Sequence, residues 1–171
     1  TRGIVWSAYL VADAIQSNIK RQESGAADFP AVMILAQSQQ QIVYQAKANL
    51  TKSAGVKASI PLENIPTGIV QVTVFSEDNK PLAERILFVN HQDYYFITDL
   101  NTPVKNFTKK AKNVIQVDVP DTLICNLSIA VTDLGVNPAQ PGDQDIFSHL
   151  LVASDIKGYV HNPGYYFSSE A

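Results

Sequence analysis

The clearest pattern in the chain is the alternation of apolar and polar positions between residues 69 and 75. Its apolar positions are three valines, Val70, Val72 and Val74. Alternation with a period of two sends one set of side chains into a core and the other set outward. A polar turn at residues 77–80 follows, then a second apolar strand over residues 82–89. This stretch therefore predicts an antiparallel hairpin.

Shorter apolar runs upstream predict further strands. Residues 1–10 predict a lead-in or edge strand, and the wholly apolar residues 31–36 predict a central strand buried on both faces. Residues 13–22 place Ile15 and Ile19 on one face with a serine between them. The two isoleucines also fit one face of a helix, but a strand is preferred here because strands follow.

Strands are also expected at residues 42–50 and 57–62. The chain then holds about six or seven short strands before residue 90, with turn signals roughly every 8–15 residues, as in an immunoglobulin-like sandwich. We therefore predict an all-β fold, with an immunoglobulin- or fibronectin-III-like antiparallel β-sandwich over residues 1–90. The Cys-Trp-Cys signature of antibody domains is absent.

A polar link at residues 91–93 predicts a boundary, after which residues 91–171 form a second, smaller β region. Its expected strands are few for a complete sandwich; they cover residues 94–97, 113–119 and 123–132. A short helix is predicted from residue 146 to about residue 154, capped by the acidic residues that precede it. The aromatic tail is expected either to pack on this second region or to form an interface.

Composition narrows the classes of partner. The net charge is −3, and only 17% of the residues are charged. This argues against a nucleic-acid interface, which needs clustered lysine and arginine. The basic cluster at residues 105–112 is interrupted by uncharged residues, so we interpret it as a solvated turn between strands.

Cys125 is the single cysteine, so neither an internal disulfide nor a cysteine metal site is possible. We expect it to be a small buried apolar residue. No apolar run approaches the roughly 18–20 residues of a membrane-spanning helix. No signal peptide is visible at residue 1, and we interpret the chain as a piece of a longer protein.

Candidate chemistry is sparse. The three histidines, His91, His149 and His161, lie far apart in the sequence, whereas a metal site needs converging ligands. The acidic residues 143 and 145 are better explained by helix capping than by calcium binding. The sequence has no nucleophile elbow and no glycine-rich phosphate loop. We therefore predict no enzyme activity, no cofactor and no metal.

Aromatic side chains are the remaining candidates for a binding surface. Five of them form a possible interaction surface for a glycan or peptide: Trp6, Tyr94, Tyr95, Tyr165 and Tyr166. Aromatics on one open face would favour glycan binding, and aromatics buried between sheets would favour a spacer.

Two stretches resemble a known family. Residues 66–69 (PTGI), the polar turn and residues 81–85 (PLAER) resemble the macroglobulin-type sandwich domains of large secreted and surface proteins of Bacteroidetes, similar to those of bacterial alpha-macroglobulins. Residues 127–133, with the later segments 150–159 and 163–167, resemble the continuation of those proteins. There, tandem sandwich domains often precede a TonB-receptor plug-like region. The resemblance covers most of residues 60–167.

The resemblance implies a place in the periplasm or on the outer-membrane surface, and it supplies no catalytic residues. The thioester motif Cys-Gly-Glu-Gln of true alpha-macroglobulins is absent. Residues 121–123 resemble the O-glycosylation acceptor used in Bacteroidetes, which makes Thr122 a possible site. We expect a non-enzymatic structural or interaction module of a larger cell-envelope protein. It would space or present other domains of that protein and dock partners, with an outer-membrane receptor as one candidate. The alternative is a glycan- or peptide-binding module of an outer-membrane uptake system.

Overall fold

The structure is a computed structural model that describes residues 3–22, 28–96, 98–119, 124–133, 135–136, 138, 140 and 142–168. Antiparallel sheets dominate, which confirms the predicted all-β class. The chain divides into two compact units. The sandwich unit holds residues 1–93 and 141–171, and the hairpin unit holds residues 94–140. The C-terminal residues therefore group with the sandwich.

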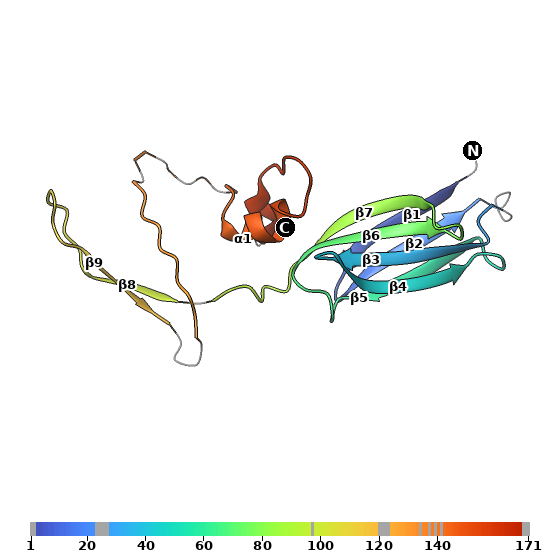
Figure 1. The fold of residues 1–171 in the computed structure, drawn as a ribbon, viewed down its shortest axis with the longest axis horizontal. Helices are drawn as coiled ribbons and strands as arrows, with labels where there is room; N and C mark the ends of the chain where they lie inside the picture. The colour runs from blue at the N-terminus through green and yellow to red at the C-terminus, as the bar shows by residue number, and fades with distance from the viewer. Residues whose placement is uncertain are drawn as a thin grey trace. The chain divides into compact units, whose positions relative to one another are not determined.

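Seven strands of the sandwich unit form two antiparallel sheets (Figure 1). The three-stranded sheet has the order β1 (Ile4–Val11), β2 (Ala14–Arg21), β5 (Gly55–Pro61). The four-stranded sheet has the order β4 (Gln41–Asn49), β3 (Ala31–Ser38), β6 (Gly68–Ser76), β7 (Pro81–Val89). As predicted, β1 lies at an edge, β2 is a strand and not a helix, and β3 lies between two neighbours.

The inner faces of the two sheets bury one apolar cluster. Its fully buried members include Ile15, Ile19, Ile34, Ile60, Val70, Val72 and Val74. The alternating valines of β6 are thus core residues, as their pattern predicts. The prediction that β3 is buried on both faces was wrong in part, because Met33 and Leu35 on its outer face are only half-buried.

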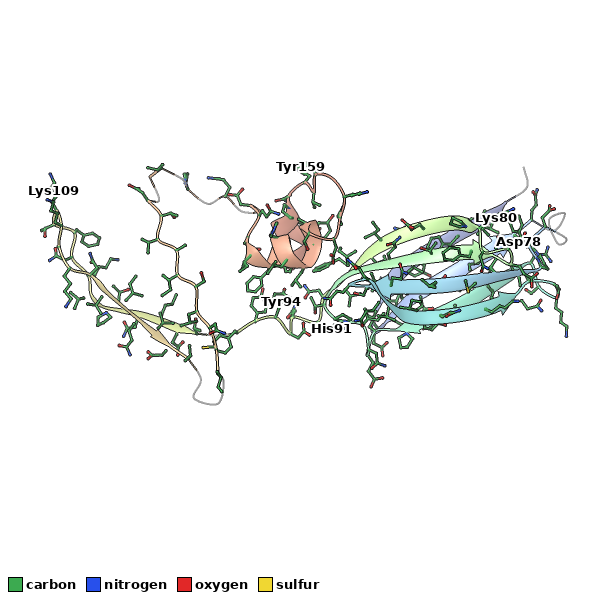
Figure 2. All side chains as sticks on the ribbon, in the orientation of Figure 1. Asp78, Lys80, His91, Tyr94, Lys109 and Tyr159 are labelled. Carbon is green, nitrogen blue, oxygen red and sulfur yellow. The ribbon has the colours of Figure 1, made fainter. Side chains whose placement is uncertain are left out.

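The β6–β7 hairpin closes through the predicted polar turn, at the end of the sandwich where Asp78 and Lys80 are labelled (Figure 2). The Ser76 amide donates to the Lys80 carbonyl at 2.8 Å, and the Asn79 amide donates to the Ser76 carbonyl at 3.0 Å. Asn79 has a φ of 59°, a left-handed conformation that asparagine tolerates better than most residues.

The C-terminal part of the sandwich unit is helical. The single-turn helix α1 (Ile146–Ser148) continues into the π-helix η2 (His149–Ala153), and the 3₁₀ helix η3 (Pro163–Phe167) follows. The predicted acidic cap is present. The Ser148 amide donates to Asp145 Oδ1 at 2.7 Å, while the Asp145 amide donates to Ser148 Oγ at 2.8 Å.

The aromatic tail packs on β7 of the sandwich. The ring of Phe88 lies 5.1 Å from that of Phe167 and 6.1 Å from that of Tyr166, between centroids. The structure thus shows the tail packed on the sandwich, and the expected interface stays a prediction, because Tyr165 and Tyr166 remain partly exposed. The tail packs there because β7 offers an apolar ring at its end, and edge-on ring contacts are favourable.

In the hairpin unit, β8 (Asp99–Val104) pairs with β9 (Val114–Asp118). The lysine-rich cluster forms the turn between them, as predicted, and Lys109 is labelled there in Figure 2. Strands predicted at residues 94–97 and 123–132 are not formed by the described residues of those ranges. Alternation records a side-chain preference, but a strand also needs a neighbour with which to exchange hydrogen bonds. Cys125 lies in this unpaired segment and is half-buried, not buried in a strand.

Candidate functional site

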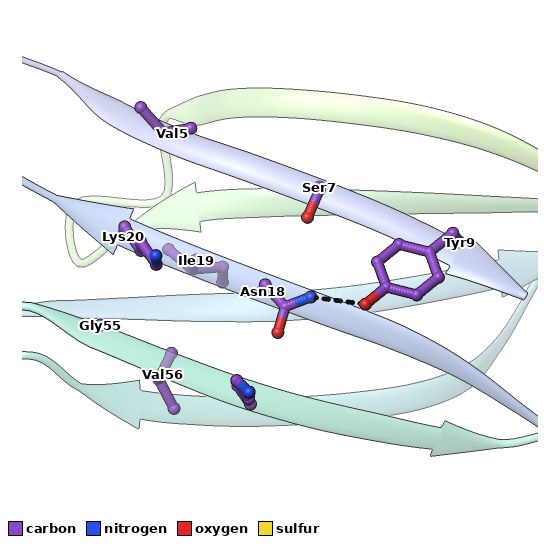
Figure 3. Close-up of a pocket in the computed structure, with 9 residues that line it drawn as sticks. Val5, Ser7, Tyr9, Asn18, Ile19, Lys20, Gly55 and Val56 are labelled. Carbon is purple, nitrogen blue, oxygen red and sulfur yellow. Dashed lines mark hydrogen bonds between the residues drawn. The ribbon is translucent and has the colours of Figure 1, made fainter. Parts of the chain in front are cut away.

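The outer face of the three-stranded sheet holds a shallow groove of about 540 Å³ (Figure 3). Its lining comes from all three strands and comprises Val5, Ser7, Tyr9, Asn18, Ile19, Lys20, Gly55, Val56 and Lys57. A hollow of this size is in the range of small-ligand sites.

Strand register places these side chains in rows across the sheet. Ser7 pairs with Asn18, which pairs with Lys57; Tyr9 lies in the next row, opposite Gln16. Ile15 and Ile19 of β2 point into the core, so the residues that alternate with them, Gln16, Asn18 and Lys20, point outward. The groove is therefore a direct product of period-two alternation in three neighbouring strands.

Gly55 opens the floor of the groove. It lies opposite Lys20, and a Cβ placed on it would come within 3.3 Å of the Ile19 carbonyl oxygen and of Lys20 Cγ. Any other residue at this position would crowd the strand beside it, so glycine leaves the backbone accessible between the two lysines.

The groove combines an aromatic ring, amides and positive charge. Asn18 Nδ2 donates to Tyr9 Oη at 3.2 Å, which holds the ring over the sheet, and Gln16 Nε2 donates to Ser59 Oγ at 3.1 Å beside it. Lys20 and Lys57 supply two cations, and β1, β2 and β5 contain no acidic residue. The face is therefore basic, although the whole chain has a net charge of −3.

The predicted aromatic residues do not share one face. Trp6 lies on the inner side of β1, half-buried against the core, and its indole N–H donates to Ser17 Oγ at 2.9 Å. Tyr165 and Tyr166 stand 5.9 Å apart on η3, partly exposed. Tyr94 and Tyr95 belong to the hairpin unit, where their rings lie 4.6 Å apart. Thr122 lies outside the described residues.

Sequence reasoning missed Tyr9 and Gly55. The available signal was the alternation of β1, which puts Tyr9 on the face opposite Trp6. The pairing of β2 with β5, which brings Gly55 beside Lys20, leaves no such signal because those strands are far apart in the chain.

A second arrangement of polar groups fixes residues 91–93, where the chain leaves the sandwich. The hydroxyl of Thr67 donates to Asp93 Oδ1 at 2.5 Å and accepts from the His91 amide at 3.0 Å. His91 Nε2 donates to the Ile65 carbonyl at 2.8 Å, so this nitrogen carries the proton. We call this set, Ile65, Thr67, His91 and Asp93, the exit joint; Figure 2 shows His91 at the opposite end of the sandwich from the Asp78 turn.

The other two histidines line a hollow of about 620 Å³ in the C-terminal segment, together with Asp143, Gln144 and Tyr159. His149 Nδ1 lies 3.1 Å from Gln144 Nε2, and the His161 ring lies 6.3 Å from that of Tyr159. Among the residues that the structure describes, no three His, Cys, Asp or Glu side chains converge to hold a metal ion.

Within the same described ranges, no helix has the length and apolar character needed to cross a membrane. A scan against protein-family models found no match to this chain, and a search of curated proteins found none either.

Proposed function

We propose that this chain is a non-enzymatic structural module of a larger bacterial cell-envelope protein, where it spaces or presents the other domains and docks partners. The observation that carries this proposal is the exit joint. A module that spaces other domains must hold the point at which the chain leaves it, and three hydrogen bonds do so here.

The geometry of the joint suits this role. Thr67 is buried just before β6, and it uses its hydroxyl both as donor and as acceptor toward residues that follow β7. The aromatic packing of Phe88 on Phe167 fixes the C-terminal segment to the last residues of the same strand. The sandwich therefore holds residues 91–93, which lead into the hairpin unit, and it also holds the end of the C-terminal segment through Phe167, which supports the spacer role.

The envelope setting rests on the resemblance of residues 66–69 and 81–85 to macroglobulin-type domains. It is tested by tagging the full-length protein in its native host and fractionating the cells. We expect the tag in the periplasmic or outer-membrane fraction. Recovery of the full-length protein in the cytoplasmic fraction would contradict the proposed setting.

The groove favours a second candidate function, the binding of a glycan or peptide. Tyr9 offers a ring on which a sugar can stack, Asn18 offers an amide, and two lysines flank the floor. Because the groove is basic, an acidic polysaccharide is the natural probe. We expect Tyr9→Ala to abolish binding of polygalacturonate, while Tyr159→Ala, an 87% exposed tyrosine outside the groove, leaves it unchanged. Equal binding by both variants would argue against the groove.

A further inference from the structure

We propose that two copies of this chain associate through β9, whose outer edge pairs in antiparallel fashion with β9 of the second copy about a two-fold axis at Ile115. This goes beyond the proposed function and does not depend on the cellular location. It concerns only the hairpin unit.

β9 has a free edge on which a further strand can pair. In the described part of the chain, β9 pairs with β8 alone. The outer edge of β8 is a poor partner, because Pro103 lacks an N–H group. β9 contains no proline, so its outer edge lacks none of the N–H groups that point outward at alternate residues. A two-stranded sheet is marginal in water, and further strands stabilise it.

The same hairpin also has an exposed apolar face. Leu100 pairs with Val117 across the two strands, and Ile115 lies on the same face of β9. Leu100 is 72% exposed and Ile115 is 61% exposed. Pairing two hairpins edge to edge would join two such faces into one continuous apolar surface.

The charged residues of the hairpin also favour pairing with a second copy. Asp99 lies directly opposite Asp118, an arrangement that destabilises a strand pair. Asp118 accepts hydrogen bonds from the neutral amide of Gln116, at 2.9 and 3.1 Å. No lysine of the adjacent turn forms an ion pair with either carboxylate in the part of the chain that the structure describes. The hairpin therefore has two oppositely charged ends. The end with Asp99 and Asp118 is acidic and has no cation beside it among the described residues, and the turn at the other end is basic.

These charges select one register. With Ile115 opposite Ile115 of the second copy, Lys112 stands opposite Asp118 of that copy, on the polar face, and symmetry repeats the pair. A shift of the axis to Val114 would instead bring Lys110 opposite Asp118. Lys110 has a φ of 60° and is part of the turn, so it cannot extend the strand. Of these two registers, the one centred on Ile115 therefore places a cation beside each acidic pair, with β9 extended by two residues to Lys112.

The test is a charge exchange, followed by sedimentation of the full chain over a wide range of concentrations. We expect a reversible dimer, weakened about tenfold or more by either Asp118→Lys or Lys112→Asp because attraction becomes repulsion at two symmetric sites. The double variant should restore dimerisation. Lys109→Asp, an exposed lysine of the same turn outside the register, is the matched control and should have a smaller effect.

A monomer at every concentration would overturn the proposal, as would a dimer that is insensitive to the two reversals or not restored by the double variant. Circular dichroism of each variant checks that the sheets remain folded. A second measurement uses Cys125→Ser as background. Mild oxidation should link Ile115→Cys into a covalent dimer. Leu100→Cys, which is even more exposed but lies away from the axis, should link poorly; the reverse order would contradict the register.

Discussion

At the scale of single residues, the inner face of the three-stranded sheet holds a polar pair. Ser17 is fully buried between Ile15 and Ile19, and its hydroxyl accepts the indole N–H of Trp6. Tryptophan contributes a large apolar surface, but its N–H group needs a partner once it leaves water. Ser17 supplies that partner, so a polar residue in the middle of an apolar strand face is stabilising here.

Removal of this partner should therefore cost stability. Ser17→Ala is expected to lower the free energy of unfolding by about 1–3 kcal/mol, because the Trp6 N–H loses its acceptor in a part-buried site. This loss is measured by urea unfolding, monitored through the fluorescence of Trp6, the single tryptophan.

The matched control is Ser59→Ala on the outer face, where the hydroxyl accepts an exposed bond from Gln16. Its effect should stay within about 0.5 kcal/mol, as for ordinary surface changes. If both variants unfold at the same urea concentration, the buried bond contributes nothing and this interpretation of Ser17 is wrong.

At the scale of elements, the β6–β7 hairpin shows how pattern and turn work together. The valines of β6 fill the core, and the turn sets the register in which β7 pairs with them. The register shifts between Val74 and Phe75, so the irregularity lies beside the turn and leaves the core-facing residues aligned. Both the core positions and the turn residue are open to direct test.

Val72 is fully buried, whereas Val5 on the outer face of β1 is 74% exposed. We expect Val72→Ala to lower the free energy of unfolding by roughly 2 kcal/mol or more, because it leaves a cavity between the sheets. Val5→Ala should change it by no more than about 0.5 kcal/mol. Chemical denaturation compares the two, and equal losses would contradict the assignment of the faces.

The turn depends on Asn79. Its left-handed backbone penalises a β-branched side chain, so Asn79→Val should cost roughly 1–2 kcal/mol, while Asn79→Gly should be close to neutral. Thermal unfolding of the two variants provides the measurement. Identical melting temperatures would show that the turn does not hold the conformation described here.

Most elements of the sandwich could be predicted from the sequence because their alternation is local. β8 could not, since residues 99–104 are mostly polar and include Pro103. Residues 124–133 show the opposite case: Leu127, Ile129 and Val131 alternate like a strand, yet they lie in an unpaired segment. Pairing depends on which neighbour is available, and that information is not local.

The groove and the exit joint were harder to predict from the sequence than the strands. Each needs residues from distant parts of the chain, such as Gly55 beside Lys20 and Thr67 beside Asp93. The chemistry of each residue is visible in the sequence, but the contact between them is set by strand pairing. The aromatic residues illustrate the same limit, since Trp6 and Tyr9 lie on opposite faces of one strand.

At the scale of the whole molecule, the sandwich is the stable body, and the exit joint holds residues 91–93 on it. The apolar cluster unites both sheets of the sandwich unit, so these sheets should unfold together. The hairpin unit contributes only β8 and β9 to regular structure in the described residues. Its amides should exchange with solvent more readily than those of β6.

The most direct test of the spacer proposal is ¹⁵N relaxation of the amides of residues 91–93 in the full chain. We predict order parameters near 0.85, equal to those of β6, and a clear fall in Thr67→Val, which loses the hydroxyl that contacts both His91 and Asp93. Order parameters below about 0.6 in the unaltered chain would show a flexible exit and contradict the proposed role.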